Sequence, residues 1–385
     1  MSVETIHIWE LGERVNVKLD ADFLLTLNQE VKKQYGTKEA IHRVLRRRYA
    51  LPFSTFKARL KTGYRYFLDL EIVLVLCDLL GISRYEMQRH IIAYKSRRGV
   101  NEIRYPILPL RVTPIVDMLI AHHIGDGTVV DPKKGRKPYF SYRQFDRQYM
   151  ALYVQKIESV FGKIHYRKPY ADVTRSYFPT VVSPLLFKLY DADTRSFLST
   201  TARIPPVILA KGADSLLAFL LGMIIDEGTV DSTTIVIVLK NKPLVKDLAE
   251  LCARLEYPVT VTERPRGKYA EYGYLFIRKE GVKRLWKDYL VLREKYPEVE
   301  LGRKGEQIAA SLALQERPIR NTAGNDHIIV SLLSQESLTV NQLARTLKMT
   351  RQGVRHHLQK LALAGRIERK RNGDGEYLYA VRNFK

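Results

Sequence analysis

The chain has 385 residues, with 64 Lys and Arg against 41 Asp and Glu and a formal net charge of +23. This length exceeds that of a usual single domain, so we expect about two to four domains. The positive charge favours a polyanionic partner, of which nucleic acid is the first candidate. The alternative, a basic protein of a membrane surface, would gather its cations on one amphipathic helix, whereas here they recur along the whole chain.

Membrane and secretion signals are absent from the sequence pattern. No uninterrupted apolar stretch reaches the length of a membrane span, and the opening MSVETIHIWE lacks the basic start and apolar run of a signal peptide. We therefore expect a cytoplasmic, nucleoid-associated protein. Cys77 and Cys252 each lie inside an apolar helical run, which predicts two buried thiols rather than a disulfide or a zinc site.

Residues 1–100 are predicted to form an N-terminal domain. The alternating stretch IHIWELGERVNVKL predicts a short hairpin, after which the pattern is helical through residue 98. A short helix is expected from Ser54 to Lys61, with its cap at Phe53 and Ser54. A longer apolar helix is expected to begin at Asp69 and to end at Gly81.

The segment of about residues 38–92 resembles a helix-turn-helix of the phage-repressor type. Eight Lys or Arg and no acid lie between His42 and Tyr66. The resemblance implies a recognition helix that presents Ser54, Thr55, Lys57, Arg59 and Lys61 to DNA. A plain helical module with a solvated basic face is the alternative.

Residues 325–385 resemble a winged helix of bacterial and archaeal regulators. We expect helices from Ile328, from Val340 to Leu347 and from the cap Thr350 through Leu363, followed by two strands around a Gly-Asp-Gly turn. The resemblance implies DNA contacts from the recognition helix and the wing, namely Arg351, Gln352, Arg355, His356, Arg369, Lys370 and Arg371. A protein-binding module is the alternative.

The centre of the chain contains a repeat. Ile124-Gly-Asp-Gly-Thr-Val recurs as Ile225-Asp-Glu-Gly-Thr-Val, 101 residues later, which predicts a duplicated unit. Each copy follows a predicted helix, one capped by Thr113 and Pro114 and the other by Asp214.

The two predicted helices end in the carboxylates Asp126 and Glu227. Acids are disfavoured at a helix C-terminus, which carries partial negative charge, so we expect a divalent cation beside them. Small residues four positions apart, Ala121 with Gly125 and Ala218 with Gly222, predict a close crossing that brings the two acids together.

The stretches LIAHHIGDG and LLGMIIDEG, the second preceded by RIPPVILAKGADSLLAF, resemble the motif helices of a monomeric, two-repeat LAGLIDADG homing endonuclease. The resemblance covers about residues 105–320. It implies an α+β fold with two pseudo-symmetric αββαββα repeats, residues 105–205 and 206–320. Their two four-stranded sheets would form a saddle for the DNA major groove, with the helix-turn-helix domain before them and the winged helix after them.

The resemblance also implies a cofactor and site residues. Mg²⁺ or Mn²⁺ would bind Asp126 and Glu227, with Asp226 as an alternative ligand in the second copy. The basic side chains expected near the reaction are Lys240 and Lys279, and the strand residues expected on DNA are Arg143, Gln144 and Arg278.

His122 and His123 replace apolar positions of the first motif. Adjacent residues of a helix point about 100° apart, so the two rings cannot serve one ion. We therefore expect packed or hydrogen-bonded histidines rather than metal ligands.

Two functions fit these observations. The first is a sequence-specific endonuclease that hydrolyses double-stranded DNA with a divalent metal. The second is a transcription regulator that keeps the fold only to bind DNA, with inert acids. Two repeats in one chain predict a monomer. The terminal residues lack splicing nucleophiles, which favours a free-standing or intron-encoded protein over an intein.

Overall fold

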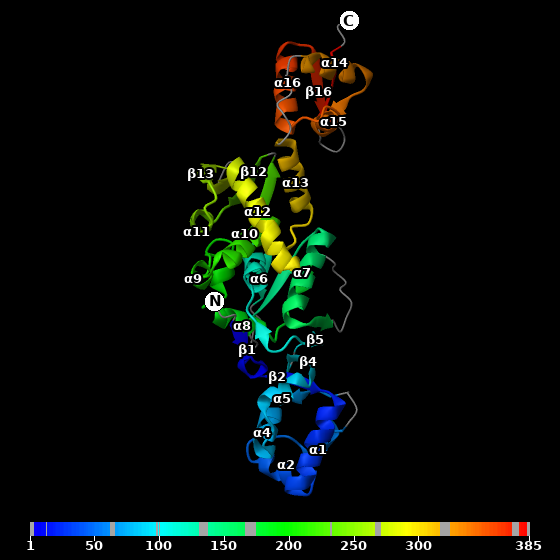
Figure 1. The fold of residues 1–385 in the computed structure, drawn as a ribbon, viewed down its shortest axis with the longest axis vertical. Helices are drawn as coiled ribbons and strands as arrows, with labels where there is room; N and C mark the ends of the chain where they lie inside the picture. Colours follow the sequence, from blue (N-terminus) through cyan, green and yellow to red (C-terminus); the bar gives the residue numbers. More distant parts are fainter. Residues whose placement is uncertain are drawn as a thin grey trace.

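The computed structural model describes residues 4–12, 14–61, 66–97, 99, 101–130, 138–165, 175–231, 233–265, 271–315, 324–371 and 377–382. These residues form helices and several small sheets, which confirms the α+β class. Along the longest axis, the first helices lie at one end, the two repeats in the middle and the last helices and strands at the other end (Figure 1). No helix of the described residues is long and apolar enough to cross a membrane.

In its described residues, the N-terminal segment combines five α-helices and a short 3-10 helix with strands of two sheets. Its elements are β1 (Thr5–Ile6), η1 (Ile8–Glu10), β2 (Val15–Leu19), α1 (Ala21–Tyr35), α2 (Lys38–Arg46), α3 (Phe53–Arg59), β3 (Leu68–Asp69), α4 (Leu70–Leu80), α5 (Arg84–Arg89), β4 (Ile91–Ser96), β5 (Glu102–Arg104) and β6 (Leu110–Arg111). The predicted α4 is confirmed: the Asp69 side chain accepts from the Glu71 amide, and Gly81 ends the helix with φ 67°.

Three local predictions in this segment are wrong. β1 and β2 do not form a hairpin, because β1 pairs with β6 and β2 pairs with β3 and β4. The helical pattern ends at Arg89, and β4 follows. α3 begins at Phe53, one residue before the predicted start at Ser54, and its N-cap residue, Pro52, makes no side-chain capping hydrogen bond. Alternating apolar residues fix a strand's faces but not its partner, which tertiary contacts decide.

Both repeats have the predicted order αββαββα. The first consists of α6 (Pro114–Ile124), β7 (Gly127–Val130), β8 (Tyr139–Arg143), α7 (Arg147–Phe161), β9 (Lys163–His165), β10 (Arg175–Tyr177) and α8 (Ser183–Leu189). The second consists of α10 (Ala213–Glu227), β11 (Gly228–Asp231), β12 (Thr234–Leu239), α11 (Lys242–Arg254), β13 (Val259–Pro265), β14 (Glu271–Ile277) and α12 (Lys279–Lys295). Between them lie η2 (Arg195–Phe197) and α9 (Pro206–Leu209).

The second repeat has the predicted four-stranded sheet, in the order β11-β12-β14-β13. In the first repeat, the described strands form a three-stranded sheet, β10-β8-β7. The missing strand, β9, instead pairs with β5 and extends the N-terminal sheet β3-β2-β4-β5-β9. The expected pair of equal four-stranded sheets is therefore wrong for the first copy. Part of the predicted strand sequence after His165 lies outside the described residues.

The two motif helices, α6 and α10, pack closely at the centre of the molecule. A Cβ added to Gly222 would lie 2.7 Å from the Ala121 Cβ and 3.0 Å from the Met118 carbonyl oxygen. One added to Gly125 would lie 2.7 Å from the Asp226 Cβ. The prediction that small residues permit a close crossing is confirmed, although α10 begins after Gly212 and not after the predicted cap Asp214.

The last part of the chain forms a separate apolar core. After η3 (Pro297–Val299) and α13 (Arg303–Gln315) come α14 (Asn325–Gln335), β15 (Leu338–Thr339), α15 (Val340–Thr346), α16 (Arg351–Leu363), β16 (Ile367–Arg371) and β17 (Tyr377–Val381). The predicted cap is present, because the Thr350 hydroxyl accepts from the Gly353 amide at 3.0 Å. β16 and β17 pair as the predicted wing, whose Gly-Asp-Gly turn lies outside the described residues.

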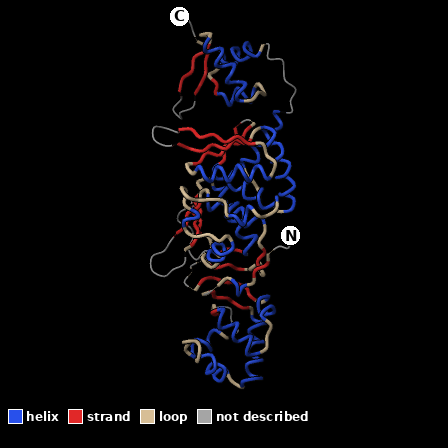
Figure 2. Tube along the Cα trace, turned by 90° about the vertical axis from the view of Figure 1, so that its left-hand side faces the viewer, coloured by secondary structure: helices blue, strands red, loops and turns tan. Residues whose placement is uncertain are grey.

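Strands and helices of the repeats lie on different sides. Seen from the side, the strands gather toward one side and the helices toward the other (Figure 2). This arrangement leaves the sheets with one face away from the helical core, as in other half-covered antiparallel sheets.

Candidate functional site

The ends of α6 and α10 bring three carboxylates together. Asp126 follows Gly125 at the end of α6, while Asp226 and Glu227 are the last two residues of α10. Burial and the neighbouring carboxylates of Asp226 and Glu227 raise the pKa of Asp126 to about 7. Burial and Asp226 also raise the pKa of Glu227. The predicted meeting of the two motif acids is thus present in the structure.

Protein donors occupy both oxygens of Asp226. The Tyr142 hydroxyl donates to Oδ1 at 2.7 Å, and Oδ2 lies 3.0 Å from Nδ1 of His122. The Asp226 side chain is fully buried. Because neither oxygen faces an open position, this arrangement argues against Asp226 as a metal ligand and indicates that it holds the first repeat to the second.

Gln144 orients Asp126. Its Nε2 donates to Oδ2 of Asp126 at 3.1 Å, while its Oε1 accepts from the backbone amides of Phe145 and Asp146 at 2.9 and 3.3 Å. These contacts fix both ends of the amide side chain. Gln144 therefore belongs to the acid site, and its predicted contact with DNA stays a prediction.

Lys304 supplies a positive charge that was not predicted. Its ammonium donates to the carbonyl oxygens of Ile224, at 2.7 Å, and Ile225, in the last turn of α10. The three carboxylates favour its charged form, but the larger effect of burial lowers its pKa. At the end of α10 this lysine of α13 places a positive charge, while the predicted divalent cation stays a prediction.

The surroundings of Asp126 and Glu227 suit a divalent cation only in part. Among the described residues, no three His, Cys, Asp or Glu side chains are placed to hold a metal ion by themselves. The Glu227 carboxylate has no hydrogen bond within the described part of the chain, and it is partly exposed, as is Asp126. Two carboxylates can hold Mg²⁺ when water and substrate oxygens complete its shell, as is common for this ion.

The two predicted reactive lysines lie outside this cluster. Lys240 follows β12 and Lys279 begins α12, and both side chains are exposed. The structure records no contact of either with the acids in the described residues. Arg143 and Arg278, also exposed, lie over the rings of Phe145 and Phe276 at 5.1 and 4.8 Å.

A second buried lysine lies near the acid cluster. Lys156 of α7 is fully buried, and its ammonium donates to the Leu152 carbonyl oxygen at 3.4 Å. Burial lowers its pKa to about 8, although Asp226 favours the charged form. In the sequence, Lys156 lies within an amphipathic helix, and nothing in that pattern indicates that its side chain is buried.

The two histidines of the first motif are packed, as predicted. His122 bonds to Asp226, and His123 stacks on Phe140 with 4.1 Å between ring centroids. Both rings are buried, and burial lowers the pKa of each, that of His123 strongly.

The predicted recognition residues of the N-terminal segment lie on α3 and just after it. Ser54, Lys57 and Lys61 are exposed, and Thr55 and Arg59 are partly exposed. Lys57 and Lys61 lie near enough to Lys38 of α2 to help lower its pKa, after the larger effect of burial. Lys38 therefore adds to the predicted basic face.

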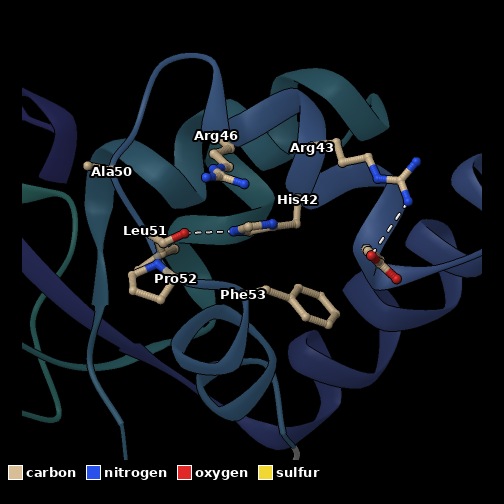
Figure 3. A pocket seen from close by; sticks show the side chains of 8 residues that line it. His42, Arg43, Arg46, Ala50, Leu51, Pro52 and Phe53 are labelled. Carbon is tan, nitrogen blue, oxygen red and sulfur yellow. Dashed lines mark hydrogen bonds and ion pairs between the residues drawn. The ribbon is translucent and has the colours of Figure 1, made fainter.

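A cleft of about 600 Å³ opens between α2 and the start of α3. His42 lies across it and bonds through Nε2 to the Leu51 carbonyl at 2.7 Å, while Arg46 and Phe53 line its sides (Figure 3). Arg43 turns toward Glu39, 3.5 Å away.

The predicted DNA contacts of the last segment are all exposed. Four lie on α16 and three on β16, in the order Arg351, Gln352, Arg355, His356, Arg369, Lys370 and Arg371. Arg369 and Arg371 lie over the Tyr377 ring of β17. Lys370 pairs with Glu368 at 2.7 Å.

Protein-family models match two regions of the chain, the second repeat and the last segment. Residues 214–288, which contain α10 with Asp226 and Glu227, match the family model described as LAGLIDADG-like domain. The second repeat is thus similar to a LAGLIDADG-like domain. Residues 328–368 match the model described as bacterial regulatory protein, arsR family. The LAGLIDADG-like match does not include Asp126, whose assignment depends on the internal repeat and on the geometry above.

Solved structures with a similar arrangement include two homing endonucleases. Mesophilic variants of I-DmoI are 14% identical, with 45% of this chain and 93% of that chain covered and a TM-score of 0.33. I-WcaI bound to its DNA recognition sequence is 10% identical, with 46% and 80% covered and a TM-score of 0.32. Full-length DUF199/WhiA from Thermatoga maritima is 11% identical, with 66% and 92% covered and a TM-score of 0.26. The comparison with curated proteins found no match.

Proposed function

We propose that this protein binds double-stranded DNA and hydrolyses its phosphodiester bonds with Mg²⁺ or Mn²⁺. The observation that carries the proposal is the meeting of Asp126 and Glu227 at the crossing of α6 and α10. Carboxylates with raised pKa values, partly exposed beside a polar side chain, are typical of functional sites. A net charge of +23 provides the attraction to DNA.

Each residue of the site has a separate task. Asp126 and Glu227 would hold the metal, which polarises the phosphate and lowers the pKa of a bound water. Gln144 keeps the Asp126 carboxylate in one orientation through its 3.1 Å hydrogen bond. Asp226, through Tyr142 and His122, fixes the end of α10 against the first repeat. Lys304 neutralises part of the negative charge.

DNA binding involves the parts of the chain on either side of the acid site. The basic faces of α3, α16 and β16 are exposed and can contact phosphates, while base edges are read from a helix in the major groove. We propose that the sheets of the repeats place the DNA backbone over the acids and that the two flanking modules lengthen the recognised site.

A second function is a DNA-binding regulator without cleavage. Two observations favour it: Lys304 already provides a cation at the end of α10, and the described residues contain no three-ligand metal cluster. The arsR-family match adds a module of a kind found in regulators. Cleavage and binding must therefore be measured separately.

The test uses Asp126→Asn, Glu227→Gln and, as a matched control, Glu294→Gln on the exposed face of α12. A plasmid library is incubated with each protein in Mg²⁺ and in EDTA, and DNA affinity is measured by fluorescence anisotropy. We expect the first two variants to lose at least about 100-fold in cleavage rate, as for loss of a main electrostatic catalyst, while binding stays within about threefold. A parent protein that binds DNA but never cuts it would contradict the proposed cleavage and favour the regulator.

A further inference from the structure

The segment that carries Lys304 is fixed in place by its neighbours. The Lys304 amide donates to the Tyr149 hydroxyl at 3.1 Å, and the adjacent Arg303 pairs with Asp146 at 2.9 Å. Both partners belong to the start of α7 in the first repeat, while the ammonium reaches α10 in the second. Lys304 thus has a defined position between the two repeats.

The Lys304 ammonium lies near the carboxylates and at the C-terminal end of α10, both of which are negative. The last carbonyl groups of a helix have no partner within the helix and carry partial negative charge. In α10 the Ile225 carbonyl is one of these, and it accepts from Lys304, as does the Ile224 carbonyl, which also accepts from the Gly228 amide. The charge of Lys304 also lowers the pKa of Asp126 and Glu227, against the larger effects of burial and of Asp226, which raise both.

We propose that Lys304 is a built-in counter-charge of the acid site: it lets Asp126, Asp226 and Glu227 share the helix crossing without a divalent cation, and it opposes the binding of one. The first part depends only on the contacts above. The second part rests on the proposed metal site, because it concerns the same carboxylates.

The acid site has two states, one without a divalent cation and one with it. Without a cation, three carboxylates at two helix ends repel one another and the helix carbonyl groups, and Lys304 offsets part of this repulsion. When a divalent cation enters, it stabilises the same carboxylates but is repelled by the ammonium nearby. With screening included, we expect this Coulomb repulsion to change the affinity for the divalent cation by about tenfold.

The experiment measures metal affinity and stability of the full chain without DNA. Lys304→Met keeps the length of the stem and removes the charge, and Lys287→Met, an exposed lysine of α12, is the matched control. In EDTA, we expect Lys304→Met to melt several degrees below the parent and the control. In calorimetric titration with Mn²⁺, we expect it to bind about tenfold more tightly than the parent.

A double variant separates the counter-charge from a purely structural contact with the helix. If Lys304 acts through the acids, Asp126→Asn should restore part of the melting temperature that Lys304→Met loses, so that the two changes are not additive. Additive losses in EDTA would overturn the first part of the proposal. Equal or undetectable Mn²⁺ binding by parent and Lys304→Met would overturn the second part.

The melting and titration experiments on Lys304→Met can be interpreted independently of the test of DNA cleavage. Lack of DNA cleavage in the parent would refute the proposed nuclease, but the melting experiment in EDTA would still decide whether Lys304 compensates the acids. If Lys304→Met does not fold in EDTA, recovery of its folded state by Mn²⁺ or by the added Asp126→Asn supports the proposal, and failure of both overturns it.

Discussion

Gly222 allows α10 to approach α6, and its replacement gives a direct test of the helix crossing. In an open helix, Gly→Ala stabilises by about 1 kcal/mol, because alanine restricts the unfolded chain and favours the helix. At position 222 the new Cβ would lie 2.7 Å from the Ala121 Cβ and 3.0 Å from the Met118 carbonyl oxygen. Overpacking of this kind costs about 1–3 kcal/mol.

The clash involves a Cβ and a backbone oxygen, neither of which can rotate away, so we expect the upper part of that range. Subtracting the gain of about 1 kcal/mol leaves Gly222→Ala less stable by about 1–2 kcal/mol, and Gly222→Val by more. Because the helix ends must separate, we also expect weaker coupling between Asp126 and Glu227 and loss of any metal-dependent activity.

Urea unfolding, followed by circular dichroism, measures the stability change. Gly305→Ala in α13 is the matched control, since its new Cβ would lie 3.2 Å from the Leu301 Cβ, with no backbone atom among its three nearest neighbours. The control should lose less stability than Gly222→Ala. If Gly222→Ala is as stable as Gly305→Ala, the close crossing of α6 and α10 is wrong, and the meeting of the acids with it.

Two further predictions concern other parts of the chain. In His123→Leu, we expect a smaller loss of stability on acidification. The folded protein keeps this buried ring neutral, whereas the unfolded chain takes up a proton below pH 6.5, so its stability contribution falls as pH falls. The parent should lose more stability than the variant between pH 7 and 5 by urea unfolding, and parallel pH curves would contradict this. In the double variant Arg351→Ala with Arg355→Ala, we expect weaker duplex binding and a salt dependence reduced by about two counterions, measured by anisotropy at several salt concentrations. An unchanged salt slope would exclude α16 as a phosphate-binding helix.

The sequence predicted the repeats because their signal is local and occurs twice. The motif around Asp126 recurs at Glu227, and the small residues beside each acid lie at helical spacing, so the crossing follows from helix geometry. The caps at Asp69 and Thr350 were predicted for the same reason, since each depends on a few neighbouring residues.

Features that depend on distant contacts were missed. Nothing near Lys304 in the sequence indicates a bond to Ile225, 79 residues earlier. Asp226 occupies a motif position that suits a metal ligand, but Tyr142 and His122, which bond its two oxygens, come from the other repeat. The three residues of β9 suit several partners equally well, and the neighbouring β5 is the one they pair with.

The pairing of β9 with β5 bears on how this chain can be divided. Residues 1–100 supply β2, β3 and β4, so their removal would leave a two-stranded remnant of β5 and β9, in which the buried Ile103 loses its cross-strand partner Tyr94. Two strands alone are marginally stable, and their open edge invites pairing between molecules. The N-terminal segment therefore cannot be removed without disturbing the first repeat. We expect a fragment that begins at the first repeat to aggregate unless another strand pairs with the open edge of this sheet.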